Sequence, residues 1–380
     1  MMASKAKKLS PVFVLVLAIL CFVVGAAAGF LGAARDNYLS PVDEYAEIAK
    51  NGRRGKVGAG GDIGGNLQIH FLELGSYYTG DCVYIKAGDT DILIDAGSKS
   101  SSVPTISAYL NNYVTDGKLE YVIVTHAHED HYAGFAAKEG IFDLYECGTI
   151  IDFALTNQKA TASTYSKYIA KRDAEIAAGA THYTAQDCIA DEKTDFAVAD
   201  GINMKILDSY YYTHEDKHTE NNYSVCMLLT EGENNYLFTG DLEADGEKYL
   251  VEMNDLPEVV LYKAGHHGSR TSSSDELLSV IKPQIVCVCC CAGSNEYRAA
   301  ESNKFPTQDF IDRVAPYTDQ VYVTTIVESD ENKTFRSMNG DITVCSDGSR
   351  VWVVCSASDL LLRETAWFEE KRTCPAAWQK

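Results

Sequence analysis

Short apolar runs that alternate with polar residues begin soon after residue 66, and they predict β-strands. Alternation at every second position is typical of a strand with one buried face, and Gly and Asp separate the runs as turns require. Other segments carry apolar residues at helical spacing. The predicted strands are 67–74, 81–88 and 91–97, and the predicted helices are 101–114, 130–142 and 271–281. Strands alternating with helices, with hairpins toward both ends, predict an α/β sandwich of sheets covered by helices. The alanine-rich, charged segment 159–195 is predicted to be a helical insertion over the main fold.

The chain begins with a basic flank followed by an uncharged stretch, residues 11–34. A stretch of this length spans a bilayer as a helix of roughly 20 residues. The basic flank favours a cytoplasmic N-terminus, which would place the rest of the chain outside the cytoplasm. Small residues near the end of the stretch leave a cleaved signal peptide as the alternative, with a secreted product. A buried core helix is the remaining alternative. A membrane anchor and a signal peptide would both export the domain.

By composition, the chain divides into four segments. We expect residues 1–34 to be the membrane anchor or signal peptide, and residues 35–66, polar and then glycine-rich, to be a flexible linker. Residues 67–356 form the predicted folded domain. The tail, 357–380, is read as packed on that domain, with an exposed partner-binding segment as the alternative.

Composition narrows the choice of partners. The formal net charge of -21 at pH 7 would repel nucleic acid and anionic membranes, so any polyanionic substrate must be attracted locally.

Twelve cysteines in an exported chain would suggest disulfides. Four of them, however, lie in the strand-like run "VCVCCCAG". These cysteines are interpreted more simply as small core residues than as zinc ligands.

The densest chemical motif is "VTHAHEDHYAG", residues 124–134, which directly follows an apolar strand. It contains His126, His128, Asp130 and His131 within six positions. Imidazole nitrogens and carboxylate oxygens suit Zn²⁺ and similar ions, and ligands from one loop can divide between two ions a few ångströms apart. The motif therefore predicts a dinuclear metal centre rather than a polar surface loop.

This motif resembles the HxHxDH signature of the metallo-β-lactamase superfamily. Further motifs stand in that family's order: "LIDAG" before it, and "YLFTGDLE" and "AGHHGS" after it. The set looks most like the hydrolase domain of ComEC-type competence proteins, and the phosphorylcholine esterases share the pattern. The resemblance implies a metallo-β-lactamase-like αββα sandwich, two β-sheets flanked by helices, and a hydrolase with two divalent ions, zinc or alternatively manganese.

The resemblance also implies roles for single residues. Asp241 corresponds to a carboxylate that bridges the two ions, although an Asp that caps a turn is the alternative. His267 corresponds to a metal ligand, and His266 to a residue that contacts the substrate anion or acts as general acid; the reverse assignment stays open. Asp95 corresponds to an Asp that orients a ligand histidine. Asp81 is a weaker candidate for a similar role, with a turn-forming Asp as its rival.

The sequence departs from the wider superfamily at one metal ligand. Classical members carry a further histidine between the HxHxDH loop and the bridging Asp, and the corresponding region here reads "HEDKHTENNYSVCMLL". Strand alignment brings Asn221, Asn222 and Ser224 near that position, with His218 a few residues upstream.

The other histidines are predicted to lie outside the site: His70 on a strand, and His182 and His214 in exposed loops. Arg270, next to Ser269, is either a phosphate-binding or a solvated residue.

Two bridged ions lower the pKa of a shared water and supply hydroxide near neutral pH, so hydrolysis is the expected reaction class. The ComEC-like motifs favour a phosphodiester, in nucleic acid or in a phosphate-linked envelope component. Asp130 or the metal-bound hydroxide would handle the nucleophile's proton, and His266 would assist the leaving oxygen. The alternatives are a β-lactamase or other amide or thioester hydrolase, and a non-catalytic metal-binding surface module. No protein partner follows from the sequence.

Overall fold

The computed structural model describes residues 53–54, 62–297 and 299–379. Within them the strands form two sheets. The first sheet contains, in spatial order, β1 (Arg53–Arg54), β17 (Val351–Cys355), β16 (Ile342–Ser346), β2 (Leu67–Phe71), β3 (Val83–Ala87), β4 (Thr90–Ile94), β5 (Lys118–Val124), β6 (Glu146–Asp152) and β7 (Thr181–Thr184). The second contains β15 (Thr334–Ser337), β14 (Val321–Ser329), β13 (Ile285–Ala292), β12 (Leu261–Lys263), β11 (Asn234–Phe238), β10 (Met227–Glu231), β9 (Ile202–Ile206) and β8 (Asp195–Ala199).

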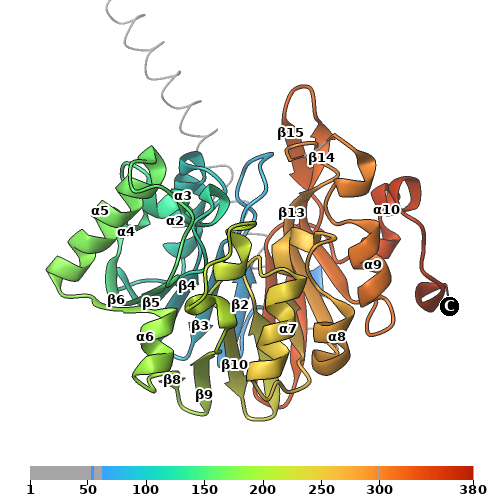
Figure 1. Cartoon of the computed structure of the whole chain (residues 1–380). Coiled ribbons are helices and arrows are strands. Elements are labelled where there is room, and N and C mark those ends of the chain that lie inside the picture. Colours follow the sequence, from blue (N-terminus) through green and yellow to red (C-terminus); the bar gives the residue numbers. More distant parts are fainter. Residues whose placement is uncertain (1–52, 55–61, 298, 380) are drawn as a thin grey trace, which may run out of the picture. The chain divides into compact units, whose positions relative to one another are not determined.

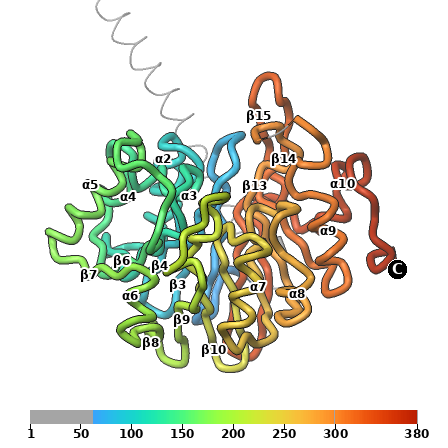
Figure 2. The backbone as a smooth tube through the Cα atoms, viewed as in Figure 1, coloured from blue at the N-terminus to red at the C-terminus, as the bar shows by residue number. Residues whose placement is uncertain are grey.

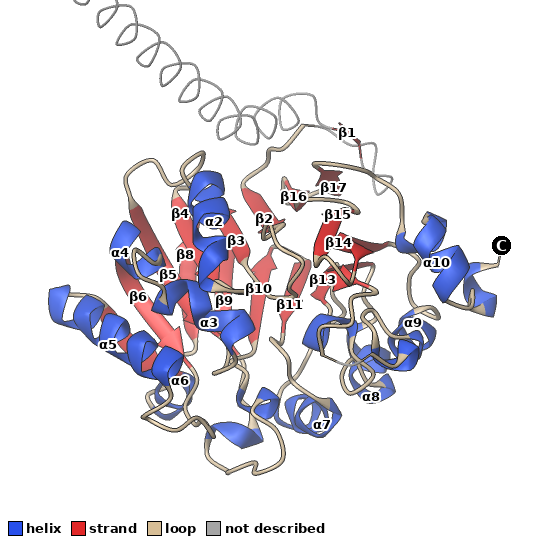
Figure 3. Ribbon diagram, turned by 90° about the horizontal axis from the view of Figure 1, so that it is seen from above, coloured by secondary structure: helices blue, strands red, loops and turns tan. Residues whose placement is uncertain are grey.

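Helices flank both sheets, as the α/β prediction requires (Figure 1). They are α2 (Val103–Leu110), α3 (Glu129–Ala136), α4 (Ile141–Leu144), α5 (Ser163–Ala178), α6 (Ala185–Ala190), α7 (Ala244–Met253), α8 (Asp275–Ile281), α9 (Gln308–Val314) and α10 (Ala366–Lys371). Seen from above, α2 to α5 lie beside β4, β5 and β6, whereas α7, α8 and α9 lie beside the second sheet (Figure 3). The αββα sandwich is therefore confirmed for the described residues.

The core lies between the two sheets and under the helices. Phe71 of the first sheet stacks on Phe238 of the second, with ring centroids 6.5 Å apart. On β13, Cys287 and Cys289 pack into the inter-sheet core, whereas Cys290 packs with the helices on the outer face. Alternating cysteines thus fill both faces of one buried strand. All of them are buried free thiols, which confirms that these cysteines are core residues.

Parallel strand pairs occur in both sheets, and they determine where loops converge. In the first sheet β4, β5, β6 and β7 pair in parallel. In the second sheet β11, β12, β13 and β14 do the same. The carboxyl ends of parallel neighbours meet at one edge, where ligands bind in α/β proteins. The colour gradient of the backbone trace shows the first half of the chain building one side of the molecule and the second half the other (Figure 2).

The segment 159–195 differs from the helical insertion that the sequence predicts. It contains α5 and α6 but also β7, which extends the first sheet beside β6. His182, expected in an exposed loop, lies on β7, and its Nε2 is 2.9 Å from Asp152 Oδ1. Asp152 is buried and also accepts hydrogen bonds from Tyr168 and Arg172 at 2.8 Å each. A buried carboxylate needs such partners, and β7 and α5 provide them through His182 and Arg172. His70, by contrast, lies on strand β2 as predicted, and His214 is exposed.

The predicted linker also contributes to the fold at two places. Residues Arg53–Arg54 form β1, which pairs with β17 and so covers the backbone edge of that strand. The backbone carbonyl of Asp62 accepts a hydrogen bond of 3.3 Å from Trp352 Nε1. The uncharged stretch 11–34 lies outside the described residues. Among the residues that are described, no helix is both long enough and apolar enough to span a membrane.

The C-terminal tail packs on the outer face of the second sheet. Leu362, Trp367, Phe368 and Trp378 belong to the core cluster that also contains the helices α7, α8 and α9. Trp378 Nε1 donates to the carbonyl of Thr318 at 2.9 Å. The tail is therefore part of the folded domain.

This packing predicts that two nearby leucines contribute differently to the free energy of unfolding. Leu362 is 0% exposed and Leu360 is 48% exposed. Leu362→Ala is expected to lower the free energy of unfolding by ~3 kcal/mol, because it removes buried apolar surface and leaves a cavity. Leu360→Ala, as the matched control, should change it by less than ~0.5 kcal/mol. Urea denaturation measures both values, and equal effects would show that the tail does not contribute to the core.

Candidate metal centre

The candidate ligands lie in loops that follow the carboxyl ends of four strands. Asp95 follows β4, the HxHxDH loop follows β5, Asp241 follows β11 and His267 lies shortly after β12. In the HxHxDH loop, His128 keeps an extended backbone and α3 begins at the next residue, with Glu129 and Asp130 in its first turn. Acidic residues are favourable there because the helix N-terminus carries a partial positive charge.

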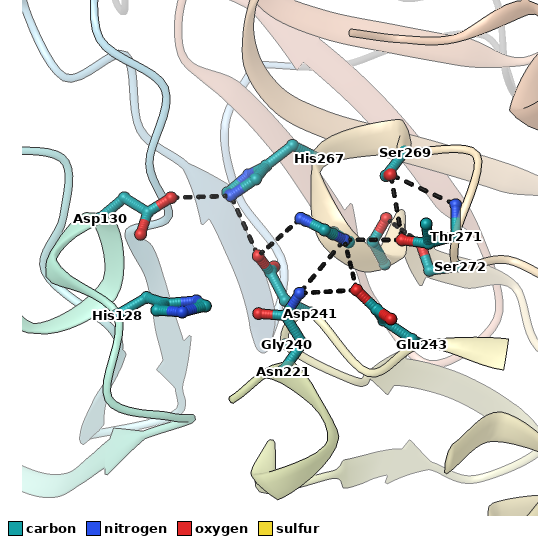
Figure 4. Close-up of polar contacts among 12 residues, drawn as sticks. His128, Asp130, Asn221, Gly240, Asp241, Glu243, His267, Ser269, Thr271 and Ser272 are labelled. Carbon is teal, nitrogen blue, oxygen red and sulfur yellow. Dashed lines mark hydrogen bonds and ion pairs between the residues drawn. The ribbon is translucent and has the colours of Figure 1, made fainter. Parts of the chain in front are cut away.

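Four of the predicted ligands form one cluster. One side-chain donor atom from each of Asp130, His131, Asp241 and His267 lies within 4.8 Å of all the others. Asp241 Oδ2 is 3.2 Å from His131 Nε2 and 3.3 Å from His267 Nε2. Asp130 Oδ2 is 3.4 Å from His267 Nε2 (Figure 4). Such a set of two carboxylates and two imidazoles suits Zn²⁺ or a similar divalent ion.

Neighbouring groups orient the two histidines of the cluster. His131 Nδ1 is 2.8 Å from Asp95 Oδ2, and Asp95 also accepts hydrogen bonds from Thr125. His267 Nδ1 is 2.9 Å from the carbonyl of Cys289 and 3.2 Å from Asp81 Oδ1. Both rings therefore present Nε2 to the cluster, as metal-binding histidines do. Asp95 and Asp81 lie where the sequence analysis expected orienting carboxylates.

Buried atoms of the cluster lack hydrogen bonds. Among the described residues, His131 Nε2, His267 Nε2 and Asp241 Oδ1 are buried and have no hydrogen-bond partner. Buried polar atoms without partners are costly, and a bound metal ion satisfies such atoms. The residues present therefore fit a divalent metal ion.

His126 and His128 form a second convergent pair beside this cluster. His126 Nε2 is 3.0 Å from His128 Nδ1, and the His126 ring centroid is 4.2 Å from that of His131. These two imidazoles are therefore a further pair of candidate ligands next to the cluster. Asn221, in the 3-10 helix η3 (Asn221–Tyr223), approaches His266 Nδ1 to 3.4 Å in the region of the missing histidine. His218 is exposed, and its backbone N–H bonds Asp216, so the structure does not bring its ring to the centre.

His266 lies at the rim rather than within the cluster. Its side chain is 22% exposed, and its Nε2 is 3.9 Å from Asp241 Oδ2. Its Nδ1 is 3.0 Å from Thr271 Oγ1 and 3.6 Å from Glu243 Oε1. Burial lowers the pKa of His266 to about 4, so the metal-free ring is neutral near pH 7. The structure thus separates His267, within the cluster, from His266, at its rim.

Two backbone features bring these loops together. Gly240 has φ +54, and a Cβ there would lie 2.8 Å from Ser224 Oγ and 2.9 Å from Thr125 Cβ. Only glycine therefore lets the loop before Asp241 lie this close to Ser224 and Thr125. His266 and His267 themselves have φ of 45 and 55 in η4 (Gly265–Gly268). Non-glycine residues with positive φ are uncommon and concentrate at functional sites.

Sequence reasoning missed two charged residues of the centre, Lys263 and Glu243. Lys263 is 2% exposed; its Nζ forms a short ion pair with Asp81, donates to the Gly240 carbonyl at 3.1 Å and lies 3.6 Å from Asp241 Oδ1. A lysine that closes the apolar run "VVLYK" was the available signal, because a lone buried lysine needs an anionic partner. Glu243 accepts a hydrogen bond of 2.9 Å from Asn221 Nδ2. Arg270 is exposed, with its guanidinium 3.4 Å from Asn303 Oδ1.

Parts of the chain are similar to known proteins. Residues 77–173 match the Metallo-beta-lactamase superfamily. The chain is 29% identical over 126 residues to Recombination protein 2 of Haemophilus influenzae, which covers 33% of this chain and 14% of that protein. It is 31% identical over 98 residues to ComE operon protein 3 of Bacillus subtilis, which covers 25% and 12% respectively. The matches therefore span a small part of these relatives' length. The metallo-beta-lactamase fold protein YhfI from Bacillus subtilis superposes with a TM-score of 0.40 at 12% identity, covering 71% of this chain and 99% of that one.

The electrostatics of the centre predict how metal binding depends on pH. Burial alone would lower the pKa of His131 and His267, but the charge of Asp241, aided by Asp95 or Asp81, outweighs it and raises both pKa values well above 6.5. Both rings are then protonated near pH 7 without metal, and binding must displace those protons.

Zinc affinity is therefore expected to fall as pH is lowered from 8 to 6, by up to about 100-fold per pH unit for two displaced protons. Calorimetry in buffers of different ionisation enthalpy measures the number of protons released. Release of about two protons per chain is expected, whereas pH-independent affinity with no release would contradict this assignment.

Proposed function

Since the chain carries a domain of the metallo-β-lactamase superfamily that resembles segments of competence proteins, we propose that it is an exported phosphodiesterase that uses two divalent metal ions. The superfamily membership and the candidate metal site support a metal-dependent hydrolase. The choice of substrate bond, the number of ions and the location are part of the proposal.

The observation that carries the proposal is the convergence of buried donor atoms on one point. Asp130, His131, Asp241 and His267 would hold one ion, and His126 and His128 would hold the other, with Asp241 between them. Two bound divalent ions would lower the pKa of a water between them and stabilise negative charge on the attacked group. Zn²⁺ is the expected metal, and Mn²⁺ is the alternative.

The polar rim supports a phosphodiester as the attacked group. Asn221 Nδ2, His266 and the hydroxyls of Thr271 and Ser269 lie close together beside the cluster, with Ser269 Oγ 3.1 Å from Thr271 Oγ1. A phosphate has non-bridging oxygens that accept several hydrogen bonds at once, and neutral donors bind it without a basic surface. This suits a protein of net charge -21, whose overall field does not attract polyanions.

Two residues of the chain would handle protons. Burial alone would raise the pKa of Asp130, but its hydrogen bond with His267 and the charge of His131 hold it well below its usual value. Asp130 therefore stays anionic near pH 7 and would accept a hydrogen bond from the attacking water, whose proton either Asp130 or a metal-bound hydroxide would handle. His266, neutral and 22% exposed at the rim, stands where a leaving oxygen would emerge. The negative charge of a bound phosphate would raise the pKa of His266, and the doubly protonated ring would then pass its Nε2 proton to that oxygen and return to the neutral form.

We further propose that the uncharged stretch 11–34 holds the domain at the outer side of a membrane, or is cleaved to release it. The substrate would then be an extracellular nucleic acid or a phosphate-linked envelope component. The sequence of this stretch and its basic flank support this location.

Loss of a direct metal ligand is expected to abolish activity. Removal of an outer partner of a metal ligand already costs about 10–100-fold in affinity or activity, so His128→Ala and Asp241→Asn should each lower bis(p-nitrophenyl) phosphate turnover by more than about 100-fold. Elemental analysis should find about two ions per chain in the wild type and fewer in both variants. His214→Ala, at an exposed histidine that stacks on Tyr210, is the control and should keep full turnover.

Unchanged turnover in both variants would refute the assignment of the centre. Bound metal with hydrolysis of a chromogenic cephalosporin but not of the phosphodiester would identify an amide hydrolase. Bound metal without turnover on any substrate would favour a binding module.

The role of His266 is tested by the leaving group. A general acid is worth about 10²–10⁴-fold when the leaving oxygen is a strong base, and little when it is a stable anion such as p-nitrophenolate. His266→Ala should therefore slow hydrolysis of a dinucleoside phosphate much more than hydrolysis of bis(p-nitrophenyl) phosphate. Steady-state kcat values on both substrates give the ratio. Equal loss on both would mean that His266 acts on substrate binding or on the metal.

A further inference from the structure

An exposed aromatic ring stands at the metal cluster. Tyr297, in the loop after β13, donates a hydrogen bond of 2.5 Å from its hydroxyl to Asp130 Oδ2. The side chain is nevertheless 49% exposed. The large exposed apolar side chains of the described part of the chain are Leu144, Met253, Tyr297 and Leu360, and among these only Tyr297 contacts a candidate metal ligand. The ring is thus anchored to the centre at one end and open to solvent along the rest.

The loop that carries Tyr297 is held by several hydrogen bonds. The backbone N–H of Asn295 donates to Asp330 Oδ1 at 3.0 Å, and Tyr77 donates from its hydroxyl to the same oxygen at 2.6 Å. Glu296 accepts from the backbone N–H of Thr79 at 2.7 Å through its Oε2. These bonds fix the residues directly before Tyr297, so the scaffold places the ring at the centre.

A second aromatic residue connects Tyr297 to the histidines of the centre. The ring centroid of Phe305 is 5.6 Å from that of Tyr297. It is 5.8 Å from the centroids of both His266 and His267. The other groups near His266, Asn221 and Glu243, are polar. One side of the mouth is therefore an aromatic wall, formed by Tyr297 and Phe305.

We propose that Tyr297 is a specificity-determining residue whose ring face stacks against a nucleobase on the side of the scissile phosphate that does not leave. This inference rests on the proposed phosphodiesterase function. Exposed aromatic rings provide stacking surfaces for bases of any sequence, and stacking needs no positive charge. Such uncharged binding energy is what a chain of net charge -21 requires to hold an anionic substrate.

The test compares two substrates with the same leaving group: thymidine 5′-(p-nitrophenyl phosphate), which carries a base, and methyl p-nitrophenyl phosphate, which does not. For each zinc-loaded variant, the ratio of kcat/KM between the two substrates does not depend on how much of the protein is folded. Tyr297→Ala should lower this ratio by about tenfold, mainly through a higher KM for the thymidine substrate. Tyr297→Phe, which keeps the ring and removes the hydroxyl, should leave the ratio unchanged, as should Leu360→Ala, the control at an equally exposed apolar residue.

An unchanged ratio in Tyr297→Ala would overturn the proposal. So would an equal fall of the ratio in Tyr297→Phe, since that would assign the effect to the hydrogen bond with Asp130. If the wild type hydrolyses neither substrate, the proposed function fails, and calorimetric binding of thymidine 5′-monophosphate and methyl phosphate decides the inference separately. Weaker binding of only the nucleotide in Tyr297→Ala would support the stacking role, and equal binding in both proteins would refute it.

Discussion

The structure depends on a group of buried carboxylates that must be neutralised at the junction of the two sheets. Asp81, Asp95 and Asp241 are each at most 2% exposed, and Asp130 adjoins them. Burying several anions together is unfavourable unless cations or hydrogen-bond donors surround them. Lys263 pairs with Asp81, and His131 and His267 face Asp241. A divalent ion at the candidate site would complete this neutralisation, and the same side chains already hold the loops of both sheets together.

The fold provides this group through the parallel strands. Each sheet contributes a parallel pair, β4 with β5 and β11 with β12, whose carboxyl ends lead directly into the ligand loops. The backbone N–H of Val225 donates to the carbonyl of Thr125 at 2.9 Å and so links the segment before β10 to the HxHxDH loop. Gly97 allows the closest approach, because a Cβ there would lie 1.6 Å from the Asp130 carbonyl oxygen. Rigid strands and tight loops thus fix the ligands without relying on long flexible segments.

The mouth of the centre has two chemically different sides. Asn221, Glu243, His266 and Thr271 form the polar side through mutual hydrogen bonds and close contacts. Tyr297 and Phe305 form the aromatic side. A substrate with a phosphate next to a planar group matches both sides at once. Under the proposed function, metal ions, neutral donors and ring faces would supply the attraction for an anionic substrate that a net charge of -21 does not supply.

Local sequence patterns were enough to predict the sandwich and most of the candidate metal ligands. Alternation along 67–74 reports which strand face is buried, and the spacing of His126, His128, Asp130 and His131 is set within one loop. The contacts between residues far apart in the chain became visible only in the folded structure. His182 lies on a strand next to Asp152, and Lys263 forms an ion pair with Asp81. Tyr297 donates a hydrogen bond to Asp130, from which it is separated by 167 positions. No local pattern encodes such pairs, because the charge or ring that each residue meets depends on how separate strand ends converge after folding.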